Sequence, residues 1–131
     1  MKLYFPLLLL AISCSPSKKL SNQLSGIWHP VQEEIGGTQL PRAAFEKQVL
    51  ELHDSTYIVT AESVDKGIVR YQKNKMDIYG KEGVNKGKHF TAIYKLENNQ
   101  LTICYNFAGT IYPESFETKG KRGYFLAVYQ K

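Results

Sequence analysis

Residues 88–107, KHFTAIYKLENNQLTICYNF, contain the pattern that decides the fold class. In both halves of this stretch an apolar side chain occupies every second position, which places these side chains on one face of a β-strand. They are Phe90, Ala92, Tyr94 and Leu96 in the first half, and Leu101, Ile103, Tyr105 and Phe107 in the second. Asn98 and Asn99 separate the halves, and asparagine is favoured in hairpin turns because it tolerates positive φ. The stretch therefore predicts an antiparallel β-hairpin with one apolar face.

Short alternating segments continue on both sides of this hairpin, each closed by turn residues. We expect further strands at 26–31, 47–53, 56–62, 68–72, 76–79 and 123–130, and loops at 80–87 and 108–122. One short helical turn is expected at 41–46, where Pro41 suits the first helical position. No apolar pattern of 3.6-residue period is long enough for a helical bundle, and strands do not alternate with helices.

About eight sequential strands predict an all-β fold, an antiparallel up-and-down β-barrel with at most one short helical turn. Closure into a barrel is favoured because it removes exposed sheet edges. An open two-sheet sandwich is the alternative. The last strand, 123–130, is apolar on both faces, so we expect closure or a partner to cover its second face.

Composition and missing motifs limit the possible functions. A chain of 131 residues with a net charge of +5 and two cysteines has the size of one domain, which excludes multidomain enzymes and disulfide-rich scaffolds. A Gly-rich phosphate loop, a Gly-x-Ser-x-Gly elbow and a His-Glu-x-x-His motif are absent from the sequence. We therefore predict no enzyme activity, no catalytic residue and no cofactor.

Isolated titratable residues give no stronger indication of chemistry. His29, His53 and His89 are far apart in the sequence, and three unrelated surface histidines are expected rather than a metal site formed by their convergence. Cys104 is expected to be a small, half-buried strand side chain, and a nucleophile–base pair with a histidine is the alternative. Glu33 and Glu34 are adjacent on a strand and point to opposite faces, which disfavours a paired-carboxylate site.

The N-terminal residues predict export and lipidation. The apolar run 3–12 would span only about 15 Å as a helix, against roughly 30 Å for a bilayer core, so a signal peptide fits better than an anchor. The run ends in Leu10-Ala11-Ile12-Ser13-Cys14, which resembles the bacterial lipobox. That resemblance implies removal of residues 1–13, lipid attachment at Cys14, a tether over 14–23 and a domain over 24–131. An ordinary secreted protein with an incidental Cys14 is the alternative.

The expected cellular location follows from the lipoprotein interpretation. Several acyl chains make membrane attachment effectively permanent. Ser15 replaces the Asp that retains some lipoproteins in the inner membrane, and no acidic export run follows it. We therefore expect a lipid-anchored protein of the cell envelope, on the periplasmic face of the outer membrane. Nucleic acid is not an expected partner there.

The segment Leu24-Ser25-Gly26-Ile27-Trp28 carries a Gly-x-Trp on the first expected strand and resembles the lipocalin signature. Further stretches resemble a family of small bacterial lipocalin-like domains without an assigned function, at 34–41, 76–78, 83–88, 92–96, 101–104 and 112–118. The resemblance implies a lipocalin-like barrel over residues 24–131, with Trp28 packed across its closed end. Lipocalins often stack an Arg near the end of the last strand over this Trp, and the candidates for that position here are Arg122 before the strand and Lys131 after it.

Aromatic residues on the expected interior faces suggest a binding role. An eight-stranded barrel is just wide enough to be filled by side chains or to hold one small ligand. The expected ligand-binding residues are Trp28, Phe90, Tyr94, Ile103, Tyr105 and Phe107. We therefore expect a lipoprotein that binds a small hydrophobic or amphipathic ligand. The alternative is a packed barrel that contacts or inhibits another envelope protein through the loop 108–122.

Positive charge concentrates in residues 66–88, which hold seven Lys and Arg residues against two acidic residues. Such a stretch is either a patch facing anionic lipid or glycan or a set of solvated strands protected from aggregation by charge.

Overall fold

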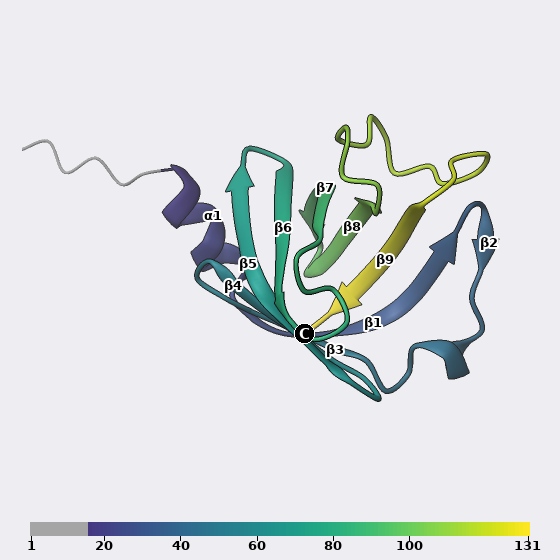
Figure 1. Cartoon of the computed structure of the whole chain (residues 1–131), viewed down its shortest axis with the longest axis horizontal. Helices are drawn as coiled ribbons and strands as arrows, with labels where there is room; N and C mark the ends of the chain where they lie inside the picture. The colour runs from purple at the N-terminus through teal and green to yellow at the C-terminus, as the bar shows by residue number, and fades with distance from the viewer. Residues whose placement is uncertain (1–15) are drawn as a thin grey trace, which may run out of the picture.

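The computed structural model describes residues 16–131, which contain nine strands and two short helical segments (Figure 1). The elements are α1 (Pro16–Leu24), β1 (Gly26–Ile35), β2 (Thr38–Gln39), the 3-10 turn η1 (Arg42–Ala44), β3 (Val49–His53), β4 (Thr56–Thr60), β5 (Val64–Gln72), β6 (Lys75–Glu82), β7 (His89–Glu97), β8 (Gln100–Asn106) and β9 (Tyr124–Gln130). The hairpin predicted at 88–107 corresponds to β7 and β8, with Leu96 opposite Leu101 next to the turn.

The fold is an all-β antiparallel barrel, as predicted, and the open-sandwich alternative is wrong. Each strand from β3 to β9 pairs with the next, and β1 closes the sheet by pairing with both β3 and β9. The short strand β2 adds a hairpin to the far end of β1. Closure leaves the interior faces of eight strands pointing toward one core.

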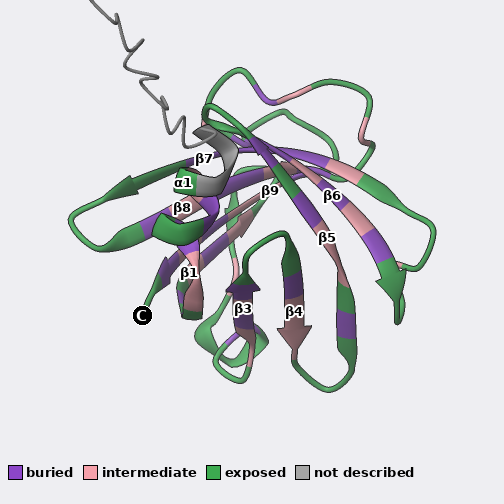
Figure 2. Cartoon of the chain, turned by 90° about the vertical axis from the view of Figure 1, so that its left-hand side faces the viewer, coloured by how far each residue is buried: buried purple, intermediate pink, exposed green. Residues whose placement is uncertain are grey.

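That core contains most of the side chains that the alternating pattern placed on one face, whereas Leu96 and Phe107 at the strand ends are exposed. Figure 2 shows buried positions recurring along the strands. The buried members of the core are Leu24, Trp28, Leu50, Leu52, Tyr57, Val69, Tyr71, Met76, Ile78, Ala92, Tyr94, Leu101, Ile103, Ala127 and Tyr129. Phe90, Tyr105 and Phe125 pack against them while remaining partly exposed.

The two ends of the barrel differ. The turns 54–55, 73–74 and 98–99 lie at the same end as α1, which we call the closed end. The segments 36–48, 61–63, 83–88 and 107–123 lie at the other end, which we call the open end. In Figure 1, α1 lies at the left and β2 at the right of the barrel.

The helix α1 is a difference from the sequence expectation, which assigned 14–23 to a tether and allowed at most one helical turn. Leu24 is buried and Leu20 packs against the core from the same helical face, four residues earlier. The backbone carbonyl of Leu24 accepts a 2.8 Å hydrogen bond from Trp28 Nε1. A nine-residue helix is marginal by itself, so these tertiary contacts stabilise it. Residues 1–15, and with them the signal peptide and Cys14, lie outside the described residues.

The cation over Trp28 is Lys131, whose Nζ lies 5.0 Å from the centre of the indole ring. Sequence analysis left this position open between Lys131 and Arg122. Trp28 is 1% exposed, so its ring is enclosed by the core on one side and capped by Lys131 on the other. Such a cation–π contact contributes about 0.5–1 kcal/mol at an exposed site.

A second apolar cluster lies outside the barrel. The side chains of Ile93, Cys104 and Tyr124 are buried there, with Tyr112, Phe116 and Leu126 packed against them. The loop 107–123 therefore covers the outer face of β7, β8 and β9. The expectation that closure or a partner covers the second face of β9 is corrected, because the chain's own loop does so.

Candidate ligand cavity

A cavity of about 170 Å³ lies inside the barrel toward the open end. Its apolar lining comprises Leu50, Leu52, Val59, Val69, Met76, Ile78, Phe90, Ile103, Phe107 and Phe125. Its polar lining comprises Gln48, Tyr57, Asp65, Asn85, Tyr105 and Tyr129. A mostly apolar cavity with a few converging polar groups is the usual form of a small-molecule site.

Four of the predicted ligand-binding residues, Phe90, Ile103, Tyr105 and Phe107, line this cavity. Trp28 and Tyr94 share the interior face with them but lie nearer the closed end. There the Tyr94 hydroxyl donates a 2.7 Å hydrogen bond to the carbonyl of Lys73 in the turn 73–74. Strand alternation predicts which face a side chain occupies, but not how deep along the barrel it lies.

Aromatic rings form the mouth of the cavity. Phe107 lies at the start of the loop 107–123 and is 45% exposed. Its ring centre lies 5.1 Å from that of Phe90 and 5.6 Å from that of Phe125. Tyr105 completes the group, 5.7 Å from Phe125. An exposed aromatic group beside a cavity offers apolar surface to an entering molecule.

A carboxylate lies among these apolar side chains. Asp65, on β5, is 8% exposed and accepts a 2.8 Å hydrogen bond from Asn85 Nδ2. The Tyr57 hydroxyl lies 3.4 Å from both carboxylate oxygens. Burial, then the charge of Asp65 and the hydrogen bond to it, raise the pKa of Tyr57. Its hydroxyl therefore stays protonated and acts as a donor.

Two glycines make room for this cluster. A Cβ at Gly67 would lie 2.0 Å from the Tyr79 carbonyl oxygen and 2.6 Å from Tyr57 Cε1. A Cβ at Gly80 would lie 1.8 Å from the carbonyl oxygen of Asn85. Any larger residue would push Tyr57 or Asn85 away from Asp65. The sequence predicts a loop at 80–87, but it gives no sign of this contact, because no local pattern links Asn85 to β5.

Further polar groups lie in the barrel interior, and two of them, Tyr105 and Tyr129, line the cavity. The hydroxyls of Tyr105 and Tyr129 are 3.0 Å apart. Glu33 on β1 pairs with Ala127 and is 1% exposed, and its Oε1 has no hydrogen-bond partner within the described residues. Burial raises the pKa of Glu33 to about 7, and the charge of Glu33 in turn contributes to raising the pKa of Tyr105 and Tyr129.

Glu33 and Glu34 point to opposite faces, as predicted. Glu34 lies on the outside, where it accepts hydrogen bonds from Thr118 Oγ1 at 2.5 Å and Gln39 Nε2 at 2.8 Å. Glu33 and Glu34 therefore do not form a carboxylate pair, and Glu33 alone reaches the interior.

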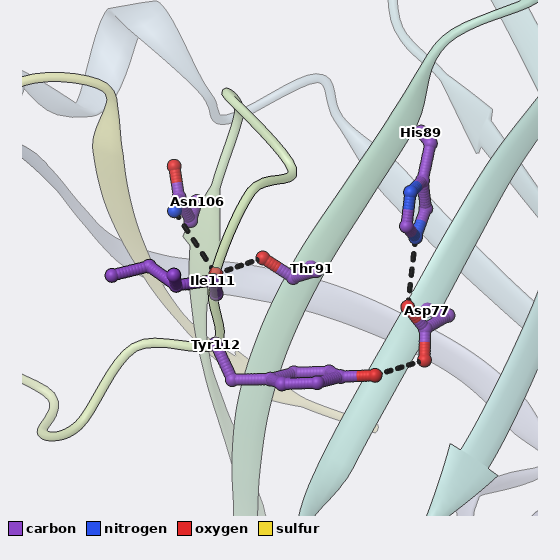
Figure 3. Close-up of polar contacts among 6 residues, drawn as sticks. All are labelled: Asp77, His89, Thr91, Asn106, Ile111 and Tyr112. Carbon is purple, nitrogen blue, oxygen red and sulfur yellow. Dashed lines mark hydrogen bonds and ion pairs between the residues drawn. The ribbon is translucent and has the colours of Figure 1, made fainter.

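A separate polar cluster fastens the loop 107–123 to the outside of the barrel (Figure 3). Asp77 accepts a 2.5 Å hydrogen bond from the Tyr112 hydroxyl, and His89 Nε2 lies 2.7 Å from its other oxygen. The carbonyl of Ile111 accepts hydrogen bonds from Thr91 Oγ1 at 2.5 Å and Asn106 Nδ2 at 3.0 Å. The cluster holds the loop that begins with Phe107 at the cavity mouth.

The remaining predicted features lie elsewhere. Cys104 is fully buried outside the barrel, where burial and, secondarily, Glu34 raise the pKa of its thiol to about 11. Within residues 16–131 no three His, Cys, Asp or Glu side chains are grouped so as to hold a metal ion. In the same part of the chain, none of the helices has the length and apolar character needed to cross a bilayer.

Comparison with family models, with curated proteins and with solved structures gave no match.

Proposed function

We propose that this protein binds one small hydrophobic or amphipathic molecule inside its barrel and acts as a carrier or receptor for it. The observation that carries the proposal is the cavity of about 170 Å³ behind an exposed aromatic mouth. Binding needs no chemical step, because removing apolar ligand surface from water contributes about 25 cal/mol per Å².

The volume limits the size of the bound group. An apolar cavity of about 150 Å³ lined by Leu, Ile and Phe holds benzene. The cavity here therefore suits a single ring or a short alkyl chain. A longer ligand would extend past Phe107 into solvent, since that ring forms part of the mouth.

We also propose that the protein is a lipoprotein of the cell envelope, anchored through Cys14. The lipobox-like sequence ending at Cys14 supports this. The helix α1 begins at Pro16 and packs at the closed end. A lipid on Cys14 would therefore hold the closed end near the membrane and leave the cavity mouth facing away. The Gly-x-Trp on β1 and the barrel are also compatible with the proposed kinship to small bacterial lipocalin-like domains.

The packed interaction module is a weaker proposal. It requires a barrel whose interior is filled by side chains and a loop whose aromatic side chains are available to a partner. Tyr112 and Phe116 of the loop 107–123 instead pack against the outside of their own barrel, and the barrel retains a cavity. Both observations favour the carrier.

A binding experiment tests the carrier function. The full chain with Cys14→Ser, which cannot be lipidated, is titrated with 1-hexanol while its amide NMR resonances are followed. We expect shifts confined to residues that line the cavity. Val59→Phe fills the cavity and should abolish them. Ile58→Phe is the matched control, since Ile58 is the neighbouring position on the outer face.

Two results would contradict the carrier. One is the absence of any shift at the cavity with millimolar 1-hexanol in a folded protein. The other is unchanged 1-hexanol binding in a folded Val59→Phe protein, because binding would then lie outside the cavity.

A further inference from the structure

The charges inside the barrel all have one sign. The buried charged residues of the described chain are Glu33 and Asp65, and both are acidic. Lys66, Arg70 and Lys75, from the basic stretch 66–88, are exposed. The fold therefore separates an acidic interior from a basic exterior.

Asp65 is the charged residue of the cavity lining. The other polar lining residues are Tyr, Asn and Gln, and none of the Lys, Arg or His residues that the structure describes lines the cavity. The site therefore has no cation to receive a carboxylate or phosphate head, which would instead meet the Asp65 carboxylate. Anionic amphiphiles such as fatty acids are disfavoured for this reason.

The Asp65 carboxylate is also incompletely paired. Asn85 makes one short hydrogen bond to it, and the Tyr57 hydroxyl is a distant second donor at 3.4 Å. A carboxylate offers about four acceptor positions. In the described part of the chain no Lys, Arg or His side chain forms an ion pair with Asp65. Burying a carboxylate without a cationic partner is costly, so a cation supplied by a ligand would be stabilised there.

The side chains around Asp65 suit a ligand that combines a cationic group with an apolar group. The lining combines Asp65 with Phe90, Phe107 and Tyr105, and aromatic faces attract ammonium groups. Glu33, which does not line the cavity, is a second buried carboxyl of the barrel interior, and its Oε1 has no hydrogen-bond partner in residues 16–131.

We propose that the cavity selects a small amphipathic amine, with its ammonium group on Asp65 and its ring or short alkyl chain among the apolar lining residues. This inference rests on the proposed carrier function and narrows it to one class of ligand. Asp65 binds the head, and Tyr57 and Asn85 position the Asp65 side chain.

The test compares three probes of equal chain length that differ only in the head. Hexylamine, 1-hexanol and hexanoate are titrated at pH 7 into the full chain carrying Cys14→Ser, by calorimetry and by amide NMR. We expect hexylamine to bind at least tenfold more tightly than 1-hexanol, and hexanoate to bind more weakly than 1-hexanol. This comparison uses one protein, so it does not depend on how a cavity variant folds.

Two variants then test whether Asp65 is responsible for the preference for hexylamine over 1-hexanol. Asp65→Asn should weaken hexylamine binding at least tenfold and leave 1-hexanol binding within about twofold. Asp65→Glu keeps the charge and should keep the order of the three probes. Retained 1-hexanol binding in each variant shows that its cavity is folded.

The outcomes separate the two proposals. If 1-hexanol binds in the cavity but hexylamine binds no more tightly, the amine preference is overturned and the carrier function stands. If hexanoate binds most tightly, the assignment of Asp65 as head-group site is also overturned. If none of the three probes binds, the carrier function itself fails.

Discussion

A single extra residue in β1 decides which glutamate enters the barrel. Pro30 pairs with Tyr129 and Gln32 pairs with the next residue, Val128, so Val31 is the extra residue of a β-bulge. In a regular strand Trp28 and Glu33 would lie on opposite faces, because they are five positions apart. The bulge places both in the interior and leaves a carboxyl buried among apolar side chains.

This burial predicts a pH-dependent stability. The pKa of Glu33 is about 7 in the folded protein, against an ordinary value of 4.5. Between these values the folded state holds a proton that the unfolded state has released. The free energy of unfolding therefore falls as pH rises from about 4.5 to 7 and levels off above that. The loss is on the order of 3 kcal/mol, at about 1.4 kcal/mol for each tenfold change in proton affinity.

Glu33→Gln removes this dependence, because an amide does not titrate. We expect its free energy of unfolding to be nearly equal at pH 5 and pH 8, whereas the wild-type value is lower at pH 8. Urea denaturation of both proteins at the two pH values measures the difference. If the free energy of unfolding fell equally from pH 5 to pH 8 in both proteins, a group other than Glu33 would be responsible for the fall.

At the scale of elements, hydrogen bonds hold the loop 107–123 against the barrel at two separate places, one of them being Thr118, which forms hydrogen bonds with Glu34 and Gly37. The hydrogen bond from Tyr112 to Asp77 joins the middle of the loop to β6, and the carbonyl of Ile111 is bound from β7 and β8. The hydrogen bond to Asp77, followed by burial, raises the pKa of Tyr112 to about 12. The loop also carries Phe107 to the cavity mouth, so its docking shapes the entrance.

We predict that Tyr112→Phe loosens this loop without unfolding the barrel. The lost hydrogen bond has a carboxylate acceptor at a partly exposed site, so about 1 kcal/mol of stability is expected to disappear. Amide hydrogen exchange in residues 109–120 should accelerate, while β3 to β5 remain unchanged. Tyr79→Phe is the matched control, since its ring stacks on His89 at 4.5 Å and it lies outside the loop. Equal acceleration in both variants would contradict the role of the Tyr112 hydroxyl.

At the scale of the whole molecule, the barrel has two unlike ends. The closed end carries α1, Trp28 and Lys131, and the open end carries the cavity mouth. The proposed anchor, Cys14, is separated from the first residue of α1 by Ser15 alone. If Cys14 carries a lipid as proposed, the lipid and the cavity mouth would belong to opposite ends of the protein, and a ligand would enter from the side away from the membrane.

Fluorescent labels at the two ends test this orientation in vesicles that hold the lipidated protein. Asn74→Cys places a label in the turn 73–74 at the closed end, and Val84→Cys places one in the segment 83–88 at the open end. We expect nitroxide lipids to quench the label at position 74 more strongly. Cys104 is fully buried and should not react with the label. Stronger quenching at position 84 would reverse the orientation, and vesicle binding by Cys14→Ser would refute the anchor.

The barrel and most of its interior residues follow from local sequence, because strand alternation is a property of neighbouring residues. The stretch 88–107 alone predicted β7, β8 and four residues of the cavity lining. The bulge at Val31, the helix α1 and the docking of the loop 107–123 were not predicted. Each depends on pairing or packing with residues far away in the chain, for which the local pattern carries no signal.

The site shows the same division. The amino-acid sequence by itself determined an antiparallel sheet with aromatic side chains on one face, because a period of two places them there whatever their partners, and the pairing of β1 with β9 decided its closure. Only the tertiary structure decided that Asp65 meets Asn85 and Tyr57 in the cavity lining, and that Glu33 faces the interior. Those positions depend on strand register and on the close approach allowed at Gly67 and Gly80, which arise when distant segments pack together.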